Sequence, residues 1–513
     1  MLVTGQRKTC HGGTKMKILL VDPPFYRFIK YYNRYFPLGL AYLAAVLRDN
    51  GHQVLIYDAD ANVEKAMEMD FSALEEKYPE YINNVNRLSH SIWDEWRNVL
   101  EDFKPDMVGI SVYTVKIASA FRIGQIAKDF NPDIPVVFGG PHPSVKSDES
   151  LKIAPFVDFV LKSEAEFTFA RLVEAIGKKG ALGDIKGLSF RKDAQIFHNP
   201  DVDFIEDLDR LPFPARDLLI NKDTYTSEDM GLLMSGRGCP FECTFCSSAG
   251  VWGRKVRFRS IENVLDEIQQ VKSTYGTVQF SFKDDIFTVN TKRVLEFCRL
   301  LKERKLNIKW DCNARVNLID EQLLAQMKSA GCNGIKLGIE SGSDRILKDV
   351  MRKKITVAQT KQAAGLIRRA GIHWTGYFMM GLPSETEQEM NQTLELMRQI
   401  KPDFASLSVY EPLPGTQLYH TGVAAGLVAD QRTLDDFFEI SPKYYYFKNI
   451  KNRIDTMPDD KFRAIEQFMK TSFHRYNRGP ARIYKRARAR SALYLKKPGV
   501  LKNDITRFLA WLR

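Results

Sequence analysis

Three closely spaced cysteines are the strongest chemical signal in the sequence. Cys239, Cys243 and Cys246 have the spacing C-x3-C-x2-C and follow an apolar stretch that reads as a strand, in GLLMSGRGCPFECTFC. A loop that follows a strand lets three thiolates converge on one centre, and thiolates are ligands of both zinc and iron–sulfur clusters. The spacing therefore predicts a metal centre on this loop.

The identity of the metal follows from the number of ligands. A structural zinc site takes four ligands, normally with a second close pair of Cys or His, and an electron-transfer cluster also takes four cysteines. Three thiolates on a four-iron cube leave one iron open to a substrate or cofactor. We therefore favour a catalytic four-iron, four-sulfur cluster, and we expect the scattered remaining cysteines to be chemically inert: Cys10, Cys298, Cys312 and Cys332.

Length and composition indicate a multidomain globular protein. The chain has 513 residues, of which 44% are hydrophobic and 27% charged, and it lacks an apolar run long enough to cross a membrane. The basic start of the chain is followed by His11, Gly12 and Gly13, so it lacks a secretory signal pattern. These features predict a cytoplasmic protein in which the first residues are an extension.

The first half of the chain alternates strands and helices. Short apolar runs at Lys17–Asp22 and Gln53–Asp58 flank a helical pattern at residues 38–47, and strand patterns recur at residues 107–111, 136–139 and 159–161. Repeated alternation of this kind predicts a doubly wound parallel sheet. Residues 60–100, rich in charge and aromatic side chains, are typical of a helical insertion.

The periodicity fades between residues 187 and 228, where prolines and alternating charge indicate a connector. After this connector, six strand patterns alternate with helices, which predicts a partial or complete β/α barrel whose site lies at the carboxyl ends of its strands. The expected strands lie at residues 232–235, 278–282, 308–313, 334–339, 374–380 and 405–409.

The cysteine loop resembles that of the radical S-adenosylmethionine (SAM) superfamily, including the aromatic Phe245 before the last cysteine. The resemblance implies that the open iron binds SAM and that reduction of its sulfonium releases a 5'-deoxyadenosyl radical. Related enzymes hold the methionine and ribose of SAM with residues at the strand ends. Besides Phe245, the matching residues here are Asp284, Asp285, Arg315, Glu340 and Ser341. Taken singly, such residues are also common as helix caps or buried ion pairs.

Two further motifs, GLPSET at residues 381–386 and PLPGT at residues 412–416, also resemble the superfamily. They are turns near the expected substrate cavity. Pure turn geometry explains them equally well.

The N-terminal segment resembles the cobalamin-binding module of a large group of radical SAM enzymes, which includes the anaerobic magnesium-protoporphyrin monomethyl ester cyclase and class B radical SAM methylases. The matching strings are VDPP at residues 21–24, FPLGLAYLAAVL at 36–47, GISVYT at 109–114, GGPHPS at 139–144 and SEAEFTF at 163–169. The resemblance implies cobalamin contacts from Pro23, Pro24, Ser111, Tyr113, Thr114, Gly139, Gly140, Pro141, His142, Glu164 and Glu166.

The sequence departs from many cobalamin modules in one respect. It lacks the D-x-H-x-x-G string that supplies a lower axial histidine. His142 is the nearest candidate, but it follows the fourth strand, where a polar loop role is expected. We therefore expect water or a side chain such as Tyr113 to face the lower side of cobalamin.

The net charge of +12 is concentrated in the last segment of the chain. Residues 475–513 hold twelve Lys or Arg against the single Asp504, and they end in the amphipathic ITRFLAWLR. An anionic membrane surface and nucleic acid both suit such a tail, as does packing of its aromatic face on the barrel. Among the partners we favour a membrane surface, with a small-molecule or lipid-like substrate and an external electron donor of the flavodoxin or ferredoxin type.

Together these patterns predict a cobalamin-dependent radical SAM methyltransferase that acts on an unactivated carbon. Oxidative cyclisation or carbon–carbon coupling without methylation is the alternative reaction, and a non-catalytic cobalamin or cluster sensor is the alternative class. The expected parts are an extension (1–16), a Rossmann-like cobalamin-binding domain (17–186), a linker (187–228), a radical SAM barrel (229–425) and a mainly helical C-terminal region with a basic tail (426–513).

Overall fold

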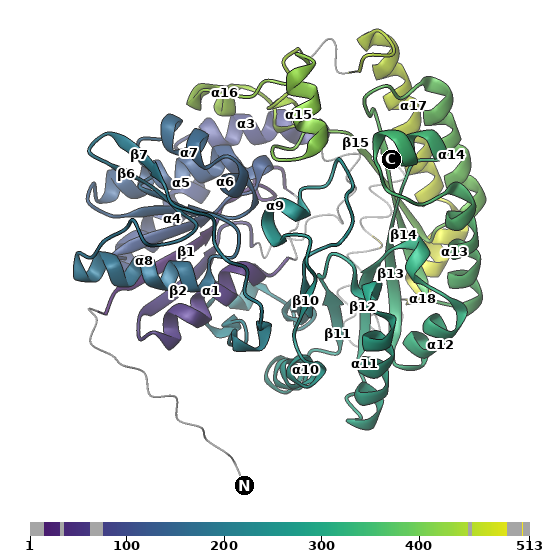
Figure 1. The fold of residues 1–513 in the computed structure, drawn as a ribbon, viewed down its shortest axis with the longest axis horizontal. Helices are drawn as coiled ribbons and strands as arrows, with labels where there is room; N and C mark the ends of the chain where they lie inside the picture. Colours follow the sequence, from purple (N-terminus) through teal and green to yellow (C-terminus); the bar gives the residue numbers. More distant parts are fainter. Residues whose placement is uncertain (1–14, 31–34, 62–74, 450–453, 490–504, 506–513) are drawn as a thin grey trace.

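The structure, a computed structural model, describes residues 15–30, 35–61, 75–449, 454–489 and 505. It has two α/β lobes, as the sequence predicts, with the N-terminal lobe on the left of Figure 1 and the barrel on the right. The extension at residues 1–14 and nearly all of ITRFLAWLR lie outside the described residues. Among the described helices, none has the length and hydrophobicity of a transmembrane segment.

The N-terminal lobe is built on a seven-stranded sheet with the order β2-β1-β3-β4-β5-β6-β7. The first five strands are parallel and coincide with the predicted ones: β1 (Lys17–Asp22), β2 (Gln53–Asp58), β3 (Met107–Ser111), β4 (Val136–Gly139) and β5 (Phe159–Leu161). The order 2-1-3-4-5 places a topological switch point between β1 and β3, and open α/β sheets bind ligands at the carboxyl ends of such strands.

Helices cover both faces of this sheet, because each parallel connection must cross from one strand to the next. The helices of the lobe are α1 (Leu38–Asp49), α3 (Tyr78–Asn86), α4 (Ser91–Phe103), α5 (Ile117–Phe130), α6 (Pro141–Val145), α7 (Ser147–Ile153) and α8 (Glu166–Lys178). Helices α3 and α4 form the helical insertion that the sequence predicts within residues 60–100.

The linker begins later than its composition suggests. Strands β6 (Leu188–Lys192) and β7 (Gln195–His198) form a hairpin that pairs antiparallel with β5 and extends the N-terminal sheet. The boundary expected at residue 186 therefore falls inside this sheet. Strand β7 forms the edge of the sheet and is mostly exposed, so its apolar pattern is weak.

The barrel is an open sheet of six parallel strands with the order β15-β14-β13-β12-β11-β8. Its strands are β8 (Leu232–Leu233), β11 (Gln279–Phe282), β12 (Lys309–Ala314), β13 (Cys332–Glu340), β14 (His373–Met380) and β15 (Phe404–Val409). Buried and half-buried residues alternate along β11 to β14, so one face carries the apolar core and the other carries polar side chains.

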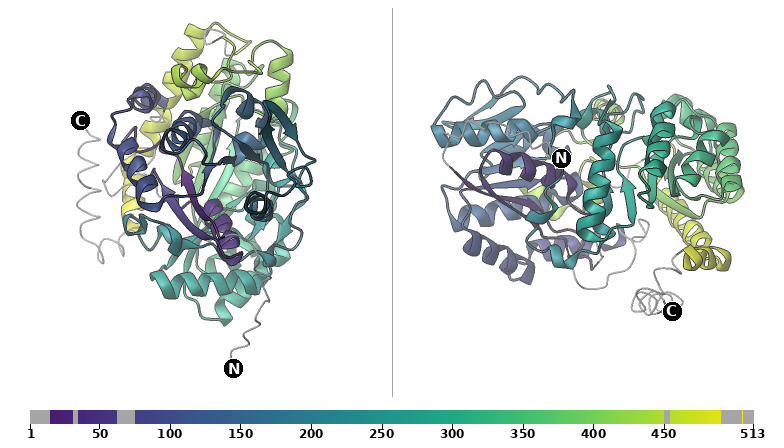
Figure 2. Two further views of the ribbon diagram at one scale, coloured as in Figure 1. Left: turned by 90° about the vertical axis from the view of Figure 1, so that its left-hand side faces the viewer. Right: turned by 90° about the horizontal axis from the view of Figure 1, so that it is seen from below.

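The helices of the barrel are α10 (Ile261–Tyr275), α11 (Thr291–Glu303), α12 (Glu321–Ser329), α13 (Val357–Ala370) and α14 (Glu387–Ile400). Helices α11 to α14 lie on the outer side of this sheet, away from the N-terminal lobe, whereas α10 lies on the side nearer to that lobe (Figure 1 and Figure 2). Each begins after a side chain that accepts a hydrogen bond from a backbone N–H of the first turn: Ser260, Asn290, Asp320, Thr356 and Thr386.

The C-terminal region contacts both lobes. After α15 (Gln417–Ala424), the helix α16 (Leu434–Glu439) and residues 441–447 return to the N-terminal lobe, where Phe437, Tyr445 and Tyr446 join its apolar core. Helix α17 (Asp459–Asn477) then packs on the barrel, where Asn477 bonds both backbone groups of Ala405. Helix α18 (Pro480–Ala489) is the described part of the basic tail.

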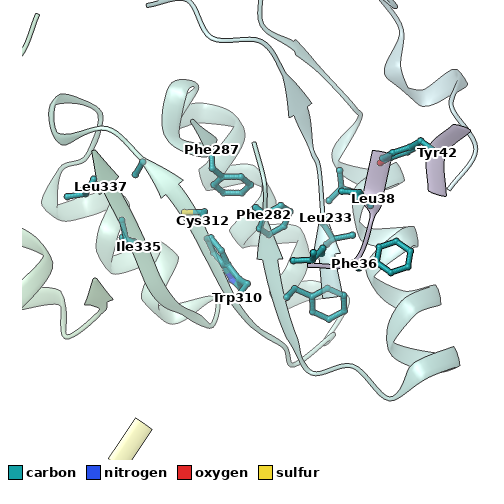
Figure 3. Packing of buried hydrophobic residues seen from close by; sticks show 14 of the residues in the cluster. Phe36, Leu38, Tyr42, Leu233, Phe282, Phe287, Trp310, Cys312, Ile335 and Leu337 are labelled. Atoms are coloured by element: carbon teal, nitrogen blue, oxygen red, sulfur yellow. The ribbon is translucent and has the colours of Figure 1, made fainter. Parts of the chain in front are cut away.

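One apolar core runs from the N-terminal lobe into the barrel. Phe36 and Leu38, at the start of α1, belong to the same buried cluster as Leu233 and Phe282 of the barrel sheet, and Figure 3 shows these side chains together. The two lobes are therefore packed into one body and do not hang from a flexible tether.

Buried ion pairs reinforce this contact. Arg237 of β9 (Gly236–Arg237) bonds Glu164 at 3.1 Å and Glu166 at 2.6 Å, and Arg257 of β10 (Arg257–Phe258) bonds Glu164 at 2.6 Å. All four side chains are buried. An unpaired charge in a buried position is costly, so the contribution of each of these four residues to stability depends on the others.

Replacing Glu164→Gln should lower the free energy of unfolding by about 3 kcal/mol, because it leaves two buried arginines short of negative charge. Denaturant unfolding followed by fluorescence measures the change. Glu206→Gln is the matched control, since Glu206 pairs with Lys255 on the surface, and it should cost less than about 1 kcal/mol. Equal effects of the two substitutions would contradict this role of Glu164.

Candidate active site

The loop with the three cysteines follows β8 and β9 and is anchored at its centre by Thr244. The backbone N–H of Thr244 bonds the carbonyl of Met351 at 3.0 Å, and its hydroxyl bonds the carbonyl of Val350 at 2.6 Å. The carbonyl of Thr244 accepts from the N–H of Leu418 at 3.0 Å. Residues Ile346–Val350 form a π-helical turn, a feature frequent at functional sites.

The three thiols lie within electrostatic reach of one another. Burial raises the pKa of the Cys239 thiol, and the charges of Asp285 and Cys243 add to this rise. The pKa of Cys246 is raised by burial and by the charges of Asp285, Cys243 and Cys239. Because metals bind thiolates, loading this loop with a cluster releases protons.

Among the described residues, no three Cys, His, Asp or Glu side chains are arranged to hold a single metal ion. A structural zinc site takes four ligands around one ion, whereas in a four-iron cluster each thiolate binds a different iron and three thiolates leave one iron open. The donor set, three thiolates on one partly exposed loop, therefore fits the cluster better than it fits zinc.

Arg315 lies beside the cysteine loop and has spare hydrogen-bonding capacity. Its guanidinium lies 3.8 Å from the centre of the Phe241 ring, and its Nη1 is 3.8 Å from the sulfur of Cys243. Its Nε donates to Asn317, whereas its buried Nη2 has no partner among the described residues. A guanidinium with a free donor suits a carboxylate, so Arg315 fits the amino-acid end of SAM.

The two neighbouring aspartates have different surroundings. Asp284 accepts hydrogen bonds from the backbone N–H of Ser235 at 2.7 Å and from its hydroxyl at 2.6 Å, and burial raises its pKa to about 6. Asp285 accepts from the hydroxyl of Ser248, and its charge acts on Cys239 and Cys246. Asp285 therefore lies at the cysteine loop, whereas Asp284 joins the ends of β8 and β11.

Glu340 connects the end of β13 to the aromatic residue of the cysteine loop. Its Oε1 accepts from Lys353 Nζ at 2.8 Å, and this ammonium lies 5.7 Å from the centre of the Phe245 ring. Glu340 has φ +67°, an uncommon conformation for a residue with a side chain and one that is often found at functional sites. A Cβ at Gly338 would lie 2.3 Å from Glu340 Oε1, so glycine makes room for this carboxylate.

Ser341 is fully buried and lies apart from the cysteine loop. Its hydroxyl lies 3.4 Å from that of Thr393 in α14 and accepts from the N–H of Ser343. The structure therefore groups Phe245, Asp285, Arg315 and Glu340 around the cysteine loop. Contacts of SAM with these four residues, and with Asp284 and Ser341, remain predictions.

The residues expected to contact cobalamin lie where strands of the N-terminal sheet end. Pro23 and Pro24 follow β1, Ser111, Tyr113 and Thr114 lie at the end of β3, and Gly139, Gly140, Pro141 and His142 lie at the end of β4. The Tyr113 side chain is half exposed. Gly140 has φ +99°, and a Cβ there would lie 3.0 Å from the backbone nitrogen of Val112, so this glycine brings the two strand ends together.

His142 is buried beneath the C-terminal region. Its Nδ1 lies 3.1 Å from the hydroxyl of Thr114, and its Nε2 is buried without a partner among the described residues. Its ring stacks at 6.3 Å on Tyr446, and Phe437 approaches it edge-on. Burial lowers its pKa to about 3, so the imidazole is neutral. Because Phe437 and Tyr446 cover this ring, the role of His142 as a cobalamin ligand stays a prediction.

Glu164 and Glu166 bond the arginines that join the lobes, and Glu166 Oε2 is buried without a partner among the described residues. Their contacts with cobalamin stay predictions beside this structural role. The sequence could not show this, because the partners lie 71 to 93 residues further along the chain.

A buried charge cluster at the ends of β1 and β2 was not predicted. Lys116 Nζ lies 3.0 Å from Asp22 and 2.8 Å from Asp60, and Tyr225 donates to Asp58. Burial and the charge of Asp22 raise the pKa of Asp58 to about 7. The signal in the sequence is the acidic residue that ends each strand pattern, in KILLVD and QVLIYDAD.

The two turns that resemble the superfamily have structural contacts. The hydroxyl of Thr416 in PLPGT accepts from the N–H of Tyr419 and caps α15. In GLPSET, Glu385 Oε2 accepts from the N–H of Leu382 at 3.1 Å, whereas its Oε1 is buried without a partner among the described residues. Burial raises the pKa of Glu385 to about 8.

Comparison with known proteins identifies both lobes. Residues 27–173 match the model of the B12 binding domain, and residues 233–397 match that of the radical SAM superfamily. An uncharacterized methyltransferase of Pyrococcus horikoshii is 34% identical over 80% of this chain and 84% of its own length. The anaerobic magnesium-protoporphyrin IX monomethyl ester cyclase of Rubrivivax gelatinosus is 31% identical over 79% of this chain and 69% of its own length.

The fold matches that of a solved radical SAM methyltransferase, TsrM from Kitasatospora setae, with a TM-score of 0.64 at 17% identity. The match covers 93% of this chain and 100% of the TsrM chain. This chain therefore belongs to the radical SAM enzymes that carry an N-terminal B12-binding domain. Its cofactors are a four-iron, four-sulfur cluster, SAM and cobalamin.

Replacing Cys243→Ala should abolish cluster loading and the formation of 5'-deoxyadenosine, because two thiolates do not hold the cluster in this loop. Corrinoid content should stay unchanged, since the substitution lies in the other lobe. Iron, sulfide and corrinoid are measured on one anaerobically reconstituted sample. Cys298→Ala, a buried cysteine of α11, is the control and should keep its iron. A Cys243→Ala protein that still cleaves SAM would refute the cluster assignment.

Glu385 should make the protein less stable as the pH rises. Its pKa is about 8 when folded and near 4.5 when unfolded, so the folded state holds the extra proton between these values. The free energy of unfolding should therefore fall by a few kcal/mol between about pH 5 and pH 8. Glu385→Gln should flatten this dependence in denaturant titrations, and an unchanged pH slope would show that Glu385 does not titrate as described.

Proposed function

We propose that this enzyme is a cobalamin-dependent radical SAM methyltransferase that transfers a methyl group to an unactivated carbon of a small molecule. The observation that carries the proposal is the position of Tyr35. The centre of its ring lies 4.8 Å from Lys283 Nζ in the barrel. Tyr26, which like Tyr35 lies between β1 and α1, packs against Lys116 at the switch point. The connection that follows β1 in the first lobe thus contacts the residue that follows β11 in the barrel.

The side chains around the cysteine loop would bind and orient SAM. Arg315 offers its free Nη2 to a carboxylate, and Asp285 offers an acceptor to an ammonium group. When bound, the cluster and SAM would supply a carbon-centred radical for hydrogen abstraction, and cobalamin would supply a methyl group. The buried ion pairs between the lobes would hold these groups at a fixed separation.

Oxidative cyclisation is the second candidate. It is favoured by the 31% identity to a magnesium-protoporphyrin ester cyclase, which shares both lobes with this chain. The 34% identity to a protein named as a methyltransferase, over a larger share of both chains, supports methylation first.

Two partners complete the proposal. A one-electron donor of the flavodoxin or ferredoxin type would reduce the cluster. The basic residues 475–513 would contact an anionic membrane surface, with nucleic acid as the alternative, because this segment holds nearly all of the excess positive charge.

The reaction is tested with reduced, cobalamin-loaded enzyme, SAM labelled in its methyl group, and a small-molecule extract. Methylation should yield S-adenosylhomocysteine and 5'-deoxyadenosine in equal amounts, together with a product heavier by one labelled CH2. A product without the label, formed with 5'-deoxyadenosine alone, would establish the cyclisation alternative. Absence of 5'-deoxyadenosine would exclude radical chemistry.

A further inference from the structure

A row of polar side chains crosses the inner face of the barrel sheet. Asp311 pairs in register with Ser281, and Asn313 pairs with Lys336, so these residues of β11, β12 and β13 lie side by side. Lys283 follows β11 on the same face, because side chains alternate along the strand and Phe282 faces the apolar core. This face is opposite helices α11 to α14 and borders the N-terminal lobe.

Lys336 pairs with a carboxylate within this row but keeps its positive charge. Its Nζ lies 2.5 Å from Asp311 Oδ1, and the hydroxyl of Ser281 donates to the same oxygen at 2.7 Å. One oxygen of Asp311 therefore accepts from a neighbour on each side.

Lys283 has no such partner. It forms no ion pair with any carboxylate that the structure describes, and its ammonium lies 4.8 Å from the centre of the Tyr35 ring. Burial and, to a smaller extent, the positive charge of Lys336 lower its pKa to about 8, and they outweigh the opposing charge of Asp311. A half-buried ammonium beside a second cation is electrostatically unfavourable, and an anion placed between them would relieve the repulsion.

Two tyrosines lie near this row, Tyr35 beside Lys283 and Tyr377 on the polar face of β14. Tyr377 is two residues beyond Thr375, which pairs in register with Lys336, and its hydroxyl forms no hydrogen bond with another described residue. Tyr377 therefore has a donor to offer beside the two ammonium groups. Cations and hydroxyl donors on one polar face are the groups that bind oxyanions in proteins.

We propose that Lys283, Lys336 and Tyr377 bind a carboxylate or phosphoryl group of the substrate, and thereby select anionic substrates. This inference rests on the proposed function, because it places the substrate between the two cofactor lobes. The carboxylate of SAM has a different candidate, since Arg315 offers its free donor at Cys243 itself. Lys283 would therefore bind a second anion, distinct from the carboxylate of SAM.

The test measures protection of lysines from chemical labelling in the cluster-loaded enzyme with SAM bound. A trace of an amine-acetylating reagent is added, and acetylation of Lys283, Lys336 and the exposed Lys292 is followed by mass spectrometry of peptides. Inorganic phosphate and acetate are titrated separately, and sodium chloride keeps the ionic strength constant. Formation of 5'-deoxyadenosine in the same sample reports on the proposed function independently.

One of the two anions should slow acetylation of Lys283 several-fold and saturably, while Lys292 is unaffected. Protection by phosphate would indicate a phosphoryl substrate, and protection by acetate a carboxylate. In Lys283→Gln, which leaves no carboxylate unpaired, the anion should no longer protect Lys336, whereas Lys292→Gln should behave as wild type. Absence of protection by either anion, or complete protection by SAM alone, would overturn the proposal.

Discussion

The close packing of two α/β lobes is the constraint on which the rest of the structure depends. Each lobe presents the carboxyl ends of parallel strands, where backbone and polar side chains are free to bind a cofactor. The two binding surfaces can act together only if the distance between them is fixed. The shared apolar core and the carboxylate of Glu164, held between Arg237 and Arg257, fix it. Buried charges of this kind favour one arrangement, because any sliding of the lobes would leave an ion unpaired.

Charge is also distributed unevenly inside the active space. The cysteine loop lies near Arg315 and Asp285, and the polar face of the barrel adds Lys283 beside the Lys336–Asp311 pair. On the other lobe, three buried aspartates surround the single Lys116. Burial and the neighbouring carboxylates raise the pKa of Asp22 and of Asp58 in this cluster, so its negative charge is smaller than three ionised carboxylates would give.

Much of the fold was predictable, because its signals are local. Strands β1 to β5 are short apolar runs that end at polar residues or glycine, or next to them, and the barrel strands were located to within a few residues. The hairpin β6–β7 escaped prediction because its outer strand is exposed and carries little hydrophobic pattern. The cysteine spacing also identified the metal loop, because the three cysteines lie close together in the chain. The roles of Glu164 and Lys283 could not be predicted in this way, because their partners lie in distant parts of the chain.

The return of the C-terminal region to the first lobe has a consequence for folding. Tyr419, Phe437, Tyr445 and Tyr446 belong to the apolar core around α3, α5 and β3, although the whole barrel sheet, from β8 to β15, separates them from it in the chain. Domains usually fold in order during synthesis, each once its own segment has emerged from the ribosome. Here the N-terminal lobe cannot close that side of its core until the barrel has been translated. Throughout that interval the lobe lacks Phe437 and Tyr446, the two aromatic rings that pack on His142 in the complete fold.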